Sequence, residues 1–362
     1  MIDANPSTPS PNGEQPSFKH LTAPQPPSTL HSIFIGADGL RAGWSLLIFI
    51  ALMAIIMVGV SHLGHKLFPP SKSPETGKAA SLRFLYFAEA IPFLATLLIT
   101  WIMSKIEDRS NSVYGLGGTR KLTHFFSGIV WGITCLSLLI LILWKSGLLI
   151  IDSRLLFGGN VLSYGTLWFI GFLLVGLLEE YLTRGYILYT LTRGLAGLYR
   201  WAFKTRHSTA LGFWTAALAL SILFGLGHGK NPGESPIGLL SAGTASLVFC
   251  LALWRTGSLW WAIGFHTSWD WGQSFLYGVS DSGLMVQHRL LAAHPVGKPI
   301  LSGGATGPEG SIFILLIFAI IAAIILFTLP GKRDNYAALL PAPKSASPDT
   351  GSLPDPAPAQ PS

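Results

Sequence analysis

The fold of this chain is decided by residues 173–185, which read LLVGLLEEYLTRG. An apolar run that starts at Leu167 ends here in two adjacent glutamates, Glu179 and Glu180, and Arg184 follows. A charged side chain at the centre of a membrane helix costs at least ~2.5 kcal/mol, so such residues are usually paired, face a cavity and serve a function. The i, i+4 spacing predicts an ion pair between Glu180 and Arg184. Glu179, rotated by about 100° around the helix, is left for another role.

The composition is that of a membrane protein. Of the 362 residues, 50% are hydrophobic and 11% are charged, whereas soluble domains contain about 25% charged residues. The mean hydropathy is +0.50. The formal net charge of +7 comes from residues scattered over many connections without a long basic face, so we expect membrane lipid and no nucleic acid among the partners.

The apolar runs predict an all-α polytopic membrane protein with about eight transmembrane helices, because a crossing takes about 20 apolar residues. We expect these spans near residues 43–63, 84–103, 124–144, 161–190, 209–228, 236–254, 258–277 and 311–329.

The expected transmembrane domain, 31–330, lies between two tails. Residues 1–30 are rich in Pro and Ser, residues 331–362 are rich in Pro and Ala, and this composition is typical of disordered chain. The connection 278–310 is long for a loop, and of the two interpretations, a lid or a solvated loop, we expect the solvated loop.

The depth of the two most polar spans presents a geometric conflict. A helix from Leu167 to Leu191 would be about 37 Å long and would place Glu179 near the middle of the membrane. Strict alternation of spans places His228 near the outer end of the fifth span. The two residues can meet only if the fifth helix lies deep, or if a segment is tilted or re-entrant.

The distribution of Lys and Arg predicts the orientation, because these residues are in excess in cytoplasmic loops. If the spans alternate and Arg184 is placed inside the membrane, fourteen Lys and Arg lie on the side of both termini and nine on the other. We therefore expect both termini in the cytoplasm and a multi-pass protein of the plasma (inner) membrane.

Three polar constellations fall on three different spans and are the candidates for chemistry. They are Glu179-Glu180-x-x-x-Arg184, Phe224-x-x-x-His228 and His266-x-x-x-Asp270. In the third, the i, i+4 spacing places the imidazole and the carboxylate on one helical face. Their co-occurrence favours function over packing, because burying several polar groups without purpose is expensive.

In their order and spacing, the three motifs resemble those of the CPBP (CAAX protease and bacteriocin-processing, or Abi) family of intramembrane proteases. That family includes the type II CAAX prenyl endopeptidases and the lysostaphin-resistance-like proteins. The resemblance covers about residues 161–280 and includes Gly185 after the arginine. It implies that the active-site residues lie on three core helices.

The resemblance implies a role for each motif residue. Glu179 would activate a water molecule, with the assistance of His228. His266 and Asp270 would stabilise the oxyanion or orient the site, and Glu180 and Arg184 would be the supporting pair. Asp270 stands where the prenyl endopeptidases typically have Asn, and an ionised carboxylate cannot donate a hydrogen bond to an oxyanion. Three roles therefore stay open for Asp270: a protonated donor, a group that orients His266, or a metal ligand.

The resulting hypothesis is an intramembrane endopeptidase that acts on a membrane-associated or CAAX-like protein or peptide and requires no cofactor. A desolvated glutamate is suited to act as a base near neutral pH. The alternative within the same class is a zinc metalloprotease that uses Glu179, His228, His266 and Asp270 as ligands. The HExxH pattern of many zinc proteases is absent, since no Glu follows either histidine.

Two functions from other classes remain as alternatives. The first is a non-catalytic membrane protein, such as an immunity or scaffold protein that retains the fold. The second is a proton-coupled transporter, for which Glu89 in the second span would be a suitable carboxylate. No inverted repeat of the kind common in transporters is visible in the sequence.

Overall fold

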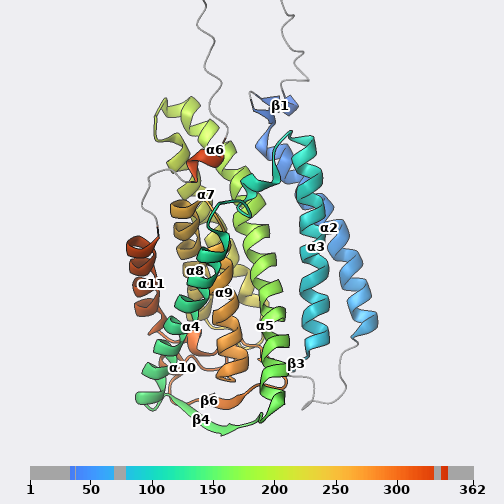
Figure 1. Ribbon diagram of the computed structural model, residues 1–362. Helices are drawn as coiled ribbons and strands as arrows, with labels where there is room; N and C mark the ends of the chain where they lie inside the picture. The colour runs from blue at the N-terminus through green and yellow to red at the C-terminus, as the bar shows by residue number, and fades with distance from the viewer. Residues whose placement is uncertain (1–32, 37, 69–78, 330–335, 341–362) are drawn as a thin grey trace, which may run out of the picture.

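The computed structural model describes residues 33–36, 38–68, 79–329 and 336–340. Nearly all of it is a bundle of long helices, drawn in Figure 1. Among the described residues, six helical segments are long and apolar enough to cross a membrane. They are α2 (Ala42–Leu67), α3 (Leu82–Ile106), α4 (Lys121–Lys145), the continuous segment Gly159–Phe203, α7 with η3 (Ser208–Lys230) and α8 (Pro236–Thr256). The chain is therefore an all-α polytopic membrane protein, as the sequence predicts.

The two remaining expected spans form shorter helices. The span near 258–277 corresponds to α9 (Trp260–Trp271) and the π-helical η4 (Gly272–Leu276), and the span near 311–329 corresponds to α11 (Ile314–Thr328). Most of α9 is buried inside the protein and contacts α4, α5 and α8. The expected count of eight transmembrane helices stays a prediction.

The fourth expected span is much longer than its apolar run. It comprises α5 (Gly159–Glu179), the π-helical η2 (Glu180–Ile187) and α6 (Leu188–Phe203), which together make 45 residues without a break. This continuous helix extends over most of the height of the bundle in Figure 1.

The length of this helix explains how Glu179 and His228 can lie at a similar depth in the bundle. The 24 residues from Glu179 to Phe203 rise by about 36 Å, and the 20 residues of α7 (Ser208–Gly227) return by about 30 Å. His228, which follows α7 directly, therefore lies at a depth close to that of Glu179.

Close backbone contacts hold α9 at the centre of the bundle. A side chain at Gly264 of α9 would collide with the backbone carbonyl of Phe125 in α4. A side chain at Gly128 of α4 would likewise collide with the carbonyl of Trp261. Small residues at such positions allow membrane helices to approach closely, so α9 and α4 pack backbone against backbone.

Short strands and turns close the lower end of the bundle in Figure 1, where β4 and β6 lie. β4 (Leu149–Arg154) pairs antiparallel with β6 (Leu291–Pro295), and β3 (Ala79–Ala80) pairs parallel with β5 (Met285–Val286). The short α10 (Pro299–Ser302) and η5 (Pro308–Gly310) follow β6. At the opposite end lie the pair β1 (Ile35–Gly36) and β2 (Gly39–Leu40), and η1 (Asn111–Tyr114) lies between α3 and α4.

The expected tail 1–30 lies outside the described residues, and so does most of the expected tail 331–362. The exception is the segment 336–340, which includes η6 (Ala337–Leu339) and packs on the helices. Tyr336 is buried with its ring centroid 4.6 Å from that of Phe213 in α7. For these five residues the structure differs from the expected disordered tail, because the aromatic side chain fills a gap in the core.

Candidate active site

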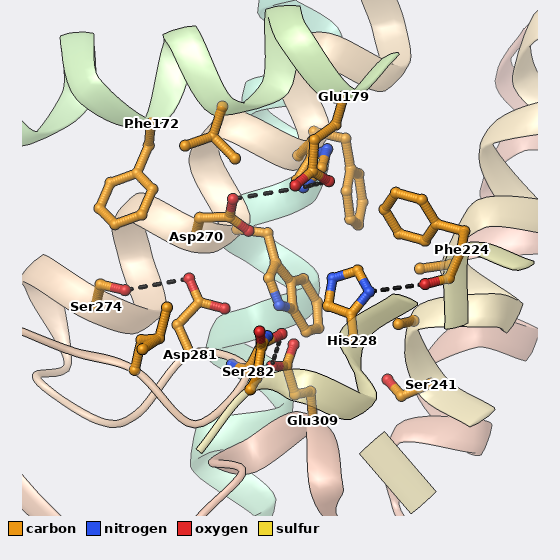
Figure 2. A pocket seen from close by; sticks show the side chains of 18 of the residues that line it. Phe172, Glu179, Phe224, His228, Ser241, Asp270, Ser274, Asp281, Ser282 and Glu309 are labelled. Atoms are coloured by element: carbon orange, nitrogen blue, oxygen red, sulfur yellow. Dashed lines mark hydrogen bonds and ion pairs between the residues drawn. The ribbon is translucent and has the colours of Figure 1, made fainter. Parts of the chain in front are cut away.

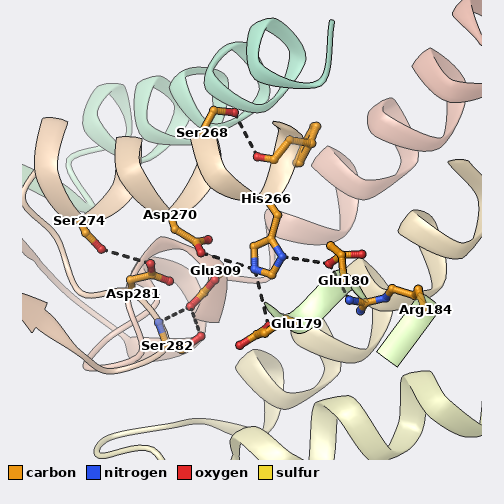
Figure 3. Close-up of polar contacts among 11 residues, drawn as sticks. Glu179, Glu180, Arg184, His266, Ser268, Asp270, Ser274, Asp281, Ser282 and Glu309 are labelled. Atoms are coloured by element: carbon orange, nitrogen blue, oxygen red, sulfur yellow. Dashed lines mark hydrogen bonds and ion pairs between the residues drawn. The ribbon is translucent and has the colours of Figure 1, made fainter. Parts of the chain in front are cut away.

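His266 is the residue that joins the first and third motifs (Figure 3). Its Nδ1 lies 3.0 Å from Oε1 of Glu180, and its Nε2 lies 3.4 Å from Oδ2 of Asp270 and 3.8 Å from Oε2 of Glu179. Asp270 is one turn away from His266 on the same helix. The two glutamates lie on the long helix, and Glu180 precedes His266 by 86 residues. Because carboxylate oxygens accept hydrogen bonds, Nδ1 of His266 donates to Glu180.

The ion pair that the spacing predicts between Glu180 and Arg184 is present, with 2.6 Å between Oε1 and Nη1. Both side chains are at most 2% exposed. The guanidinium also lies over the rings of Phe224 and Phe249, at 4.5 and 5.6 Å from the ring centroids. Arg184 thus neutralises the buried Glu180, and the same carboxylate oxygen fixes the orientation of His266.

Local helix geometry separates the two glutamates. Glu179 is the last residue of α5, and Glu180 is the first residue of η2. A π-helical segment inserted in an α-helix changes the direction of the side chains around it, and such segments are frequent at functional sites. Glu180 is fully buried, whereas the side chain of Glu179 is 31% exposed. Of the two, Glu179 is the carboxylate that is accessible from solvent and lines the cavity.

A cavity of about 510 Å³ brings the three motifs together. Figure 2 shows Glu179, His228 and Asp270 around it. Its lining combines these polar groups with apolar and aromatic side chains, among them Phe172, Val248, Phe249, Phe265, Trp269 and Phe318. An apolar cavity with a few convergent polar groups is the usual form of a site for a small ligand or a peptide.

His228 lies at the end of α7 and lines the same cavity. Its Nδ1 is 2.8 Å from the carbonyl oxygen of Phe224, the other member of its motif. A carbonyl oxygen only accepts, so Nδ1 carries the proton and Nε2 of the neutral ring is left to accept one. In the described part of the chain His228 makes no direct hydrogen bond to Glu179, so cooperation between them requires a bridging molecule.

The connection 278–310, which we expect to be a solvated loop, instead contributes to the cavity. Asp281, Ser282 and Glu309 line it. Asp281 accepts a hydrogen bond from Ser274 at 3.1 Å, and Glu309 accepts from the backbone N–H and the hydroxyl of Ser282. The expectation of a solvated loop is therefore wrong for these residues. The one feature of the sequence that indicated a functional loop is the length of the connection.

Burial raises the pKa of the Asp281 carboxyl well above its ordinary value, and the nearby carboxylates of Asp270 and Glu309 raise it further. The pKa of Glu309 is also raised by burial, although its hydrogen bonds from Ser282 act in the opposite direction. Glu89 of α3 adds a further carboxyl group to the lining. The cavity is therefore acidic, and no Lys or Arg is found among the described residues that line it.

The residues of the zinc alternative line one cavity but do not fit a metal ion in their present arrangement. Within the ranges that the structure describes, no group of three or more His, Cys, Asp or Glu side chains could hold a metal ion. Imidazole and carboxylate groups are nevertheless suitable zinc ligands.

The motif-bearing segment matches a known family. Residues 161–272 match the family model described as type II CAAX prenyl endopeptidase Rce1-like. The match covers under a third of the chain and contains all three motifs. No curated protein and no solved structure matches the chain. The predicted resemblance to the CPBP family is therefore confirmed, and it supports an integral membrane protease of the CAAX type.

Proposed function

We propose that the chain is an intramembrane endopeptidase in which Glu179 activates the attacking water. The observation that carries this proposal is the placement of His266, which touches Glu179, Glu180 and Asp270 at the edge of one cavity. Glu179 is the accessible carboxylate of that group. The proposed substrate is a membrane-associated or CAAX-like protein or peptide, whose apolar side chains match the aromatic lining.

In the first step Glu179 takes a proton from a water molecule, and the water oxygen bonds to the carbonyl carbon of the scissile peptide. The negative charge moves to the carbonyl oxygen. Nε2 of His266, when it carries a proton, is the donor that would stabilise this oxyanion. The buried pair of Glu180 and Arg184 holds the imidazole in place from the side of Nδ1.

In the second step the tetrahedral intermediate collapses and the carbon–nitrogen bond breaks. The leaving amine takes the proton that Glu179 received from water, so atoms and charges balance. His228 assists by hydrogen bonding to the water or to the leaving group, because its Nε2 is the free acceptor of the ring. General acid–base catalysis of this kind typically contributes about 10²–10⁴-fold.

Cleavage assays on the purified protein test the proposal. The substrates are a library of quenched fluorescent peptides that includes a prenylated CAAX peptide, and the variants are Glu179→Gln and His228→Gln. The exposed carboxylate variant Asp152→Asn, on β4, is the control. We expect cleavage that resists a chelator, is lost in Glu179→Gln by at least about 100-fold, falls in His228→Gln and is unchanged in the control.

Other outcomes would contradict the proposal in distinguishable ways. Loss of cleavage with chelator and its recovery with zinc would establish the metalloprotease instead. Cleavage that survives Glu179→Gln would remove Glu179 from the mechanism. A folded protein that cleaves none of the peptides would favour a non-catalytic immunity or scaffold role.

We also propose that the protein resides in the plasma (inner) membrane with both termini in the cytoplasm. The excess of Lys and Arg on that side supports this orientation. Reporter proteins fused to either terminus, one active only in the cytoplasm and one only outside it, test the proposal. Activity of the outside reporter at either end would contradict it.

A further inference from the structure

A basic groove lies at the end of the bundle where α6 and β1 are found in Figure 1. It consists of two adjacent cavities of about 700 and 570 Å³, between the starts of α2 and α7 and the last turns of α6. The two cavities share three lining residues, Asp38, Arg193 and Arg200. We call this feature the basic groove.

Four arginines line the basic groove and one acid opposes them. Arg41 lines the first cavity, Arg206 lines the second, and Arg193 and Arg200 line both, whereas Asp38 is the one acidic residue among the described residues of the two linings. The groove therefore carries a net positive charge. Concave sites lined by one sign of charge concentrate ligands of the opposite sign.

Arg193 shows how the groove is built. It is 7% exposed, and its guanidinium donates to the carbonyl of Leu40 at 2.8 Å and to the hydroxyl of Ser45 at 3.1 Å. Glu107 lies 3.9 Å from the same group. Its buried Nε has no hydrogen-bond partner among the described residues. The positive charge is thus fixed in place by the protein and is only partly compensated.

Two helix N-termini add to this positive potential. The first residues of α2, Ala42 and Gly43, line one cavity, and the first residues of α7, Ser208 and Thr209, line the other. Neither helix has a side-chain hydrogen bond at its N-cap or an acidic residue in its first turn. The first N–H groups of a helix have no partner within the helix, and the positive end of each helix dipole favours an anion beside it.

The surroundings of the groove are those of a membrane surface. The ends of three segments that are long and apolar enough to cross a membrane meet here, and lipid headgroups are expected beside the ends of such spans. Beside it, Leu198, Trp201 and Phe203 near the end of α6 are 53, 80 and 69% exposed. Exposed aromatic side chains at the end of a span are typical of the interface between headgroups and hydrocarbon.

We propose that the basic groove binds the phosphate headgroup of an anionic phospholipid. The arginines and the two helix N-termini bind the phosphate, and the acyl chains lie along the exposed apolar faces of α2 and α6, including Leu47 and Ile50. Basic pockets between membrane helices are suited to such headgroups. The exposed Trp201 and Phe203 favour a lipid over a free phosphate ion, which would gain nothing from them.

Lipid binding to the purified protein in detergent tests the proposal without reference to any catalytic activity. Native mass spectrometry compares phosphatidylglycerol with phosphatidylcholine of the same acyl chains, and inorganic phosphate is the competitor. We expect phosphatidylglycerol to bind at least about tenfold more tightly and to raise the melting temperature. Excess inorganic phosphate at constant ionic strength should not displace it.

The double variant R200Q/R206Q removes two charges from side chains that are at least partly exposed, so the fold is retained. It should lose the preference for phosphatidylglycerol by about tenfold. The matched control, K145Q/R154Q, removes two charges at the β4 end of the bundle and should keep it.

Three results would overturn the proposal. The first is equal binding of the two lipids by the wild-type protein, a comparison that needs no variant. The second is a preference that R200Q/R206Q retains in full. The third is displacement of phosphatidylglycerol by inorganic phosphate, which would identify a free anion as the ligand.

Discussion

Nδ1 of His266 lies 3.0 Å from Oε1 of Glu180, and the same oxygen is 2.6 Å from Nη1 of Arg184. One carboxylate oxygen therefore connects the central helix α9 with the π-helical segment of the long helix. This contact orients the imidazole without using Glu179, which stays accessible from the cavity. The supporting pair and the proposed base are thus separated although they are adjacent in the sequence.

Replacing Arg184 alone should destabilise the protein strongly. Arg184→Met leaves the fully buried Glu180 uncompensated, and breaking a buried pair in this way typically costs about 3–5 kcal/mol. The double variant Glu180→Gln/Arg184→Met removes both charges and should recover most of the loss in melting temperature. A double variant as unstable as Arg184→Met would show that the pair does not act as a unit.

Two substitutions distinguish whether Asp270 acts through its negative charge or through hydrogen bonds. Asp270→Asn retains an oxygen at the position 3.4 Å from His266 and adds two donors beside the cavity. We expect it to keep cleavage within about tenfold of wild type, while Asp270→Leu loses about 100-fold or more. Kinetics of peptide cleavage measure both. If Asp270→Asn is as inactive as Asp270→Leu, the charge of the carboxylate is itself required.

The close packing of α9 on α4 predicts that a larger residue at Gly264 is not tolerated. Gly264→Val places its side chain against the carbonyl of Phe125 and should destabilise the protein by at least about 1–3 kcal/mol. Gly59→Val is the matched control, because Gly59 also lies in a helix but faces open space. Thermal unfolding in detergent measures the melting temperatures of both variants. Equal melting temperatures for Gly264→Val and Gly59→Val would contradict the close packing of α9 on α4.

The raised pKa of Asp281 predicts a pH-dependent contribution to stability. A carboxyl group whose pKa is raised in the folded state binds its proton more tightly there, so its stabilisation is complete below its ordinary pKa of 3.8. That stabilisation is lost as the pH rises through the raised value. The Asn side chain of Asp281→Asn cannot ionise. The melting temperature of this variant should therefore rise relative to that of the wild type as the pH increases from 4 towards neutrality.

The exposed variant Asp152→Asn controls for the pH series. A difference between Asp281→Asn and wild type that stays constant over the whole series would contradict the raised pKa.

The sequence alone determined the features that depend on near neighbours in the chain. Apolar runs of sufficient length predict membrane helices, and six of the eight expected spans correspond to helices long enough to cross. The i, i+4 spacing predicts the pair of Glu180 and Arg184, because helical geometry sets that distance whatever surrounds it. The three motifs predict the family match over residues 161–272.

Only the tertiary structure decided which of these residues meet. The contact between His266 and Glu180 spans 86 positions and depends on how α9 packs against its neighbours. The common depth of His228 and Glu179 follows from a helix that continues beyond its apolar run, and hydropathy does not record where such a helix ends. The carboxylates of Asp281 and Glu309 line the cavity because the loop that carries them packs against the helices. The composition of a loop does not show whether its side chains are buried. Contacts between distant segments depend on packing, whereas spacing along one helix is fixed by its backbone.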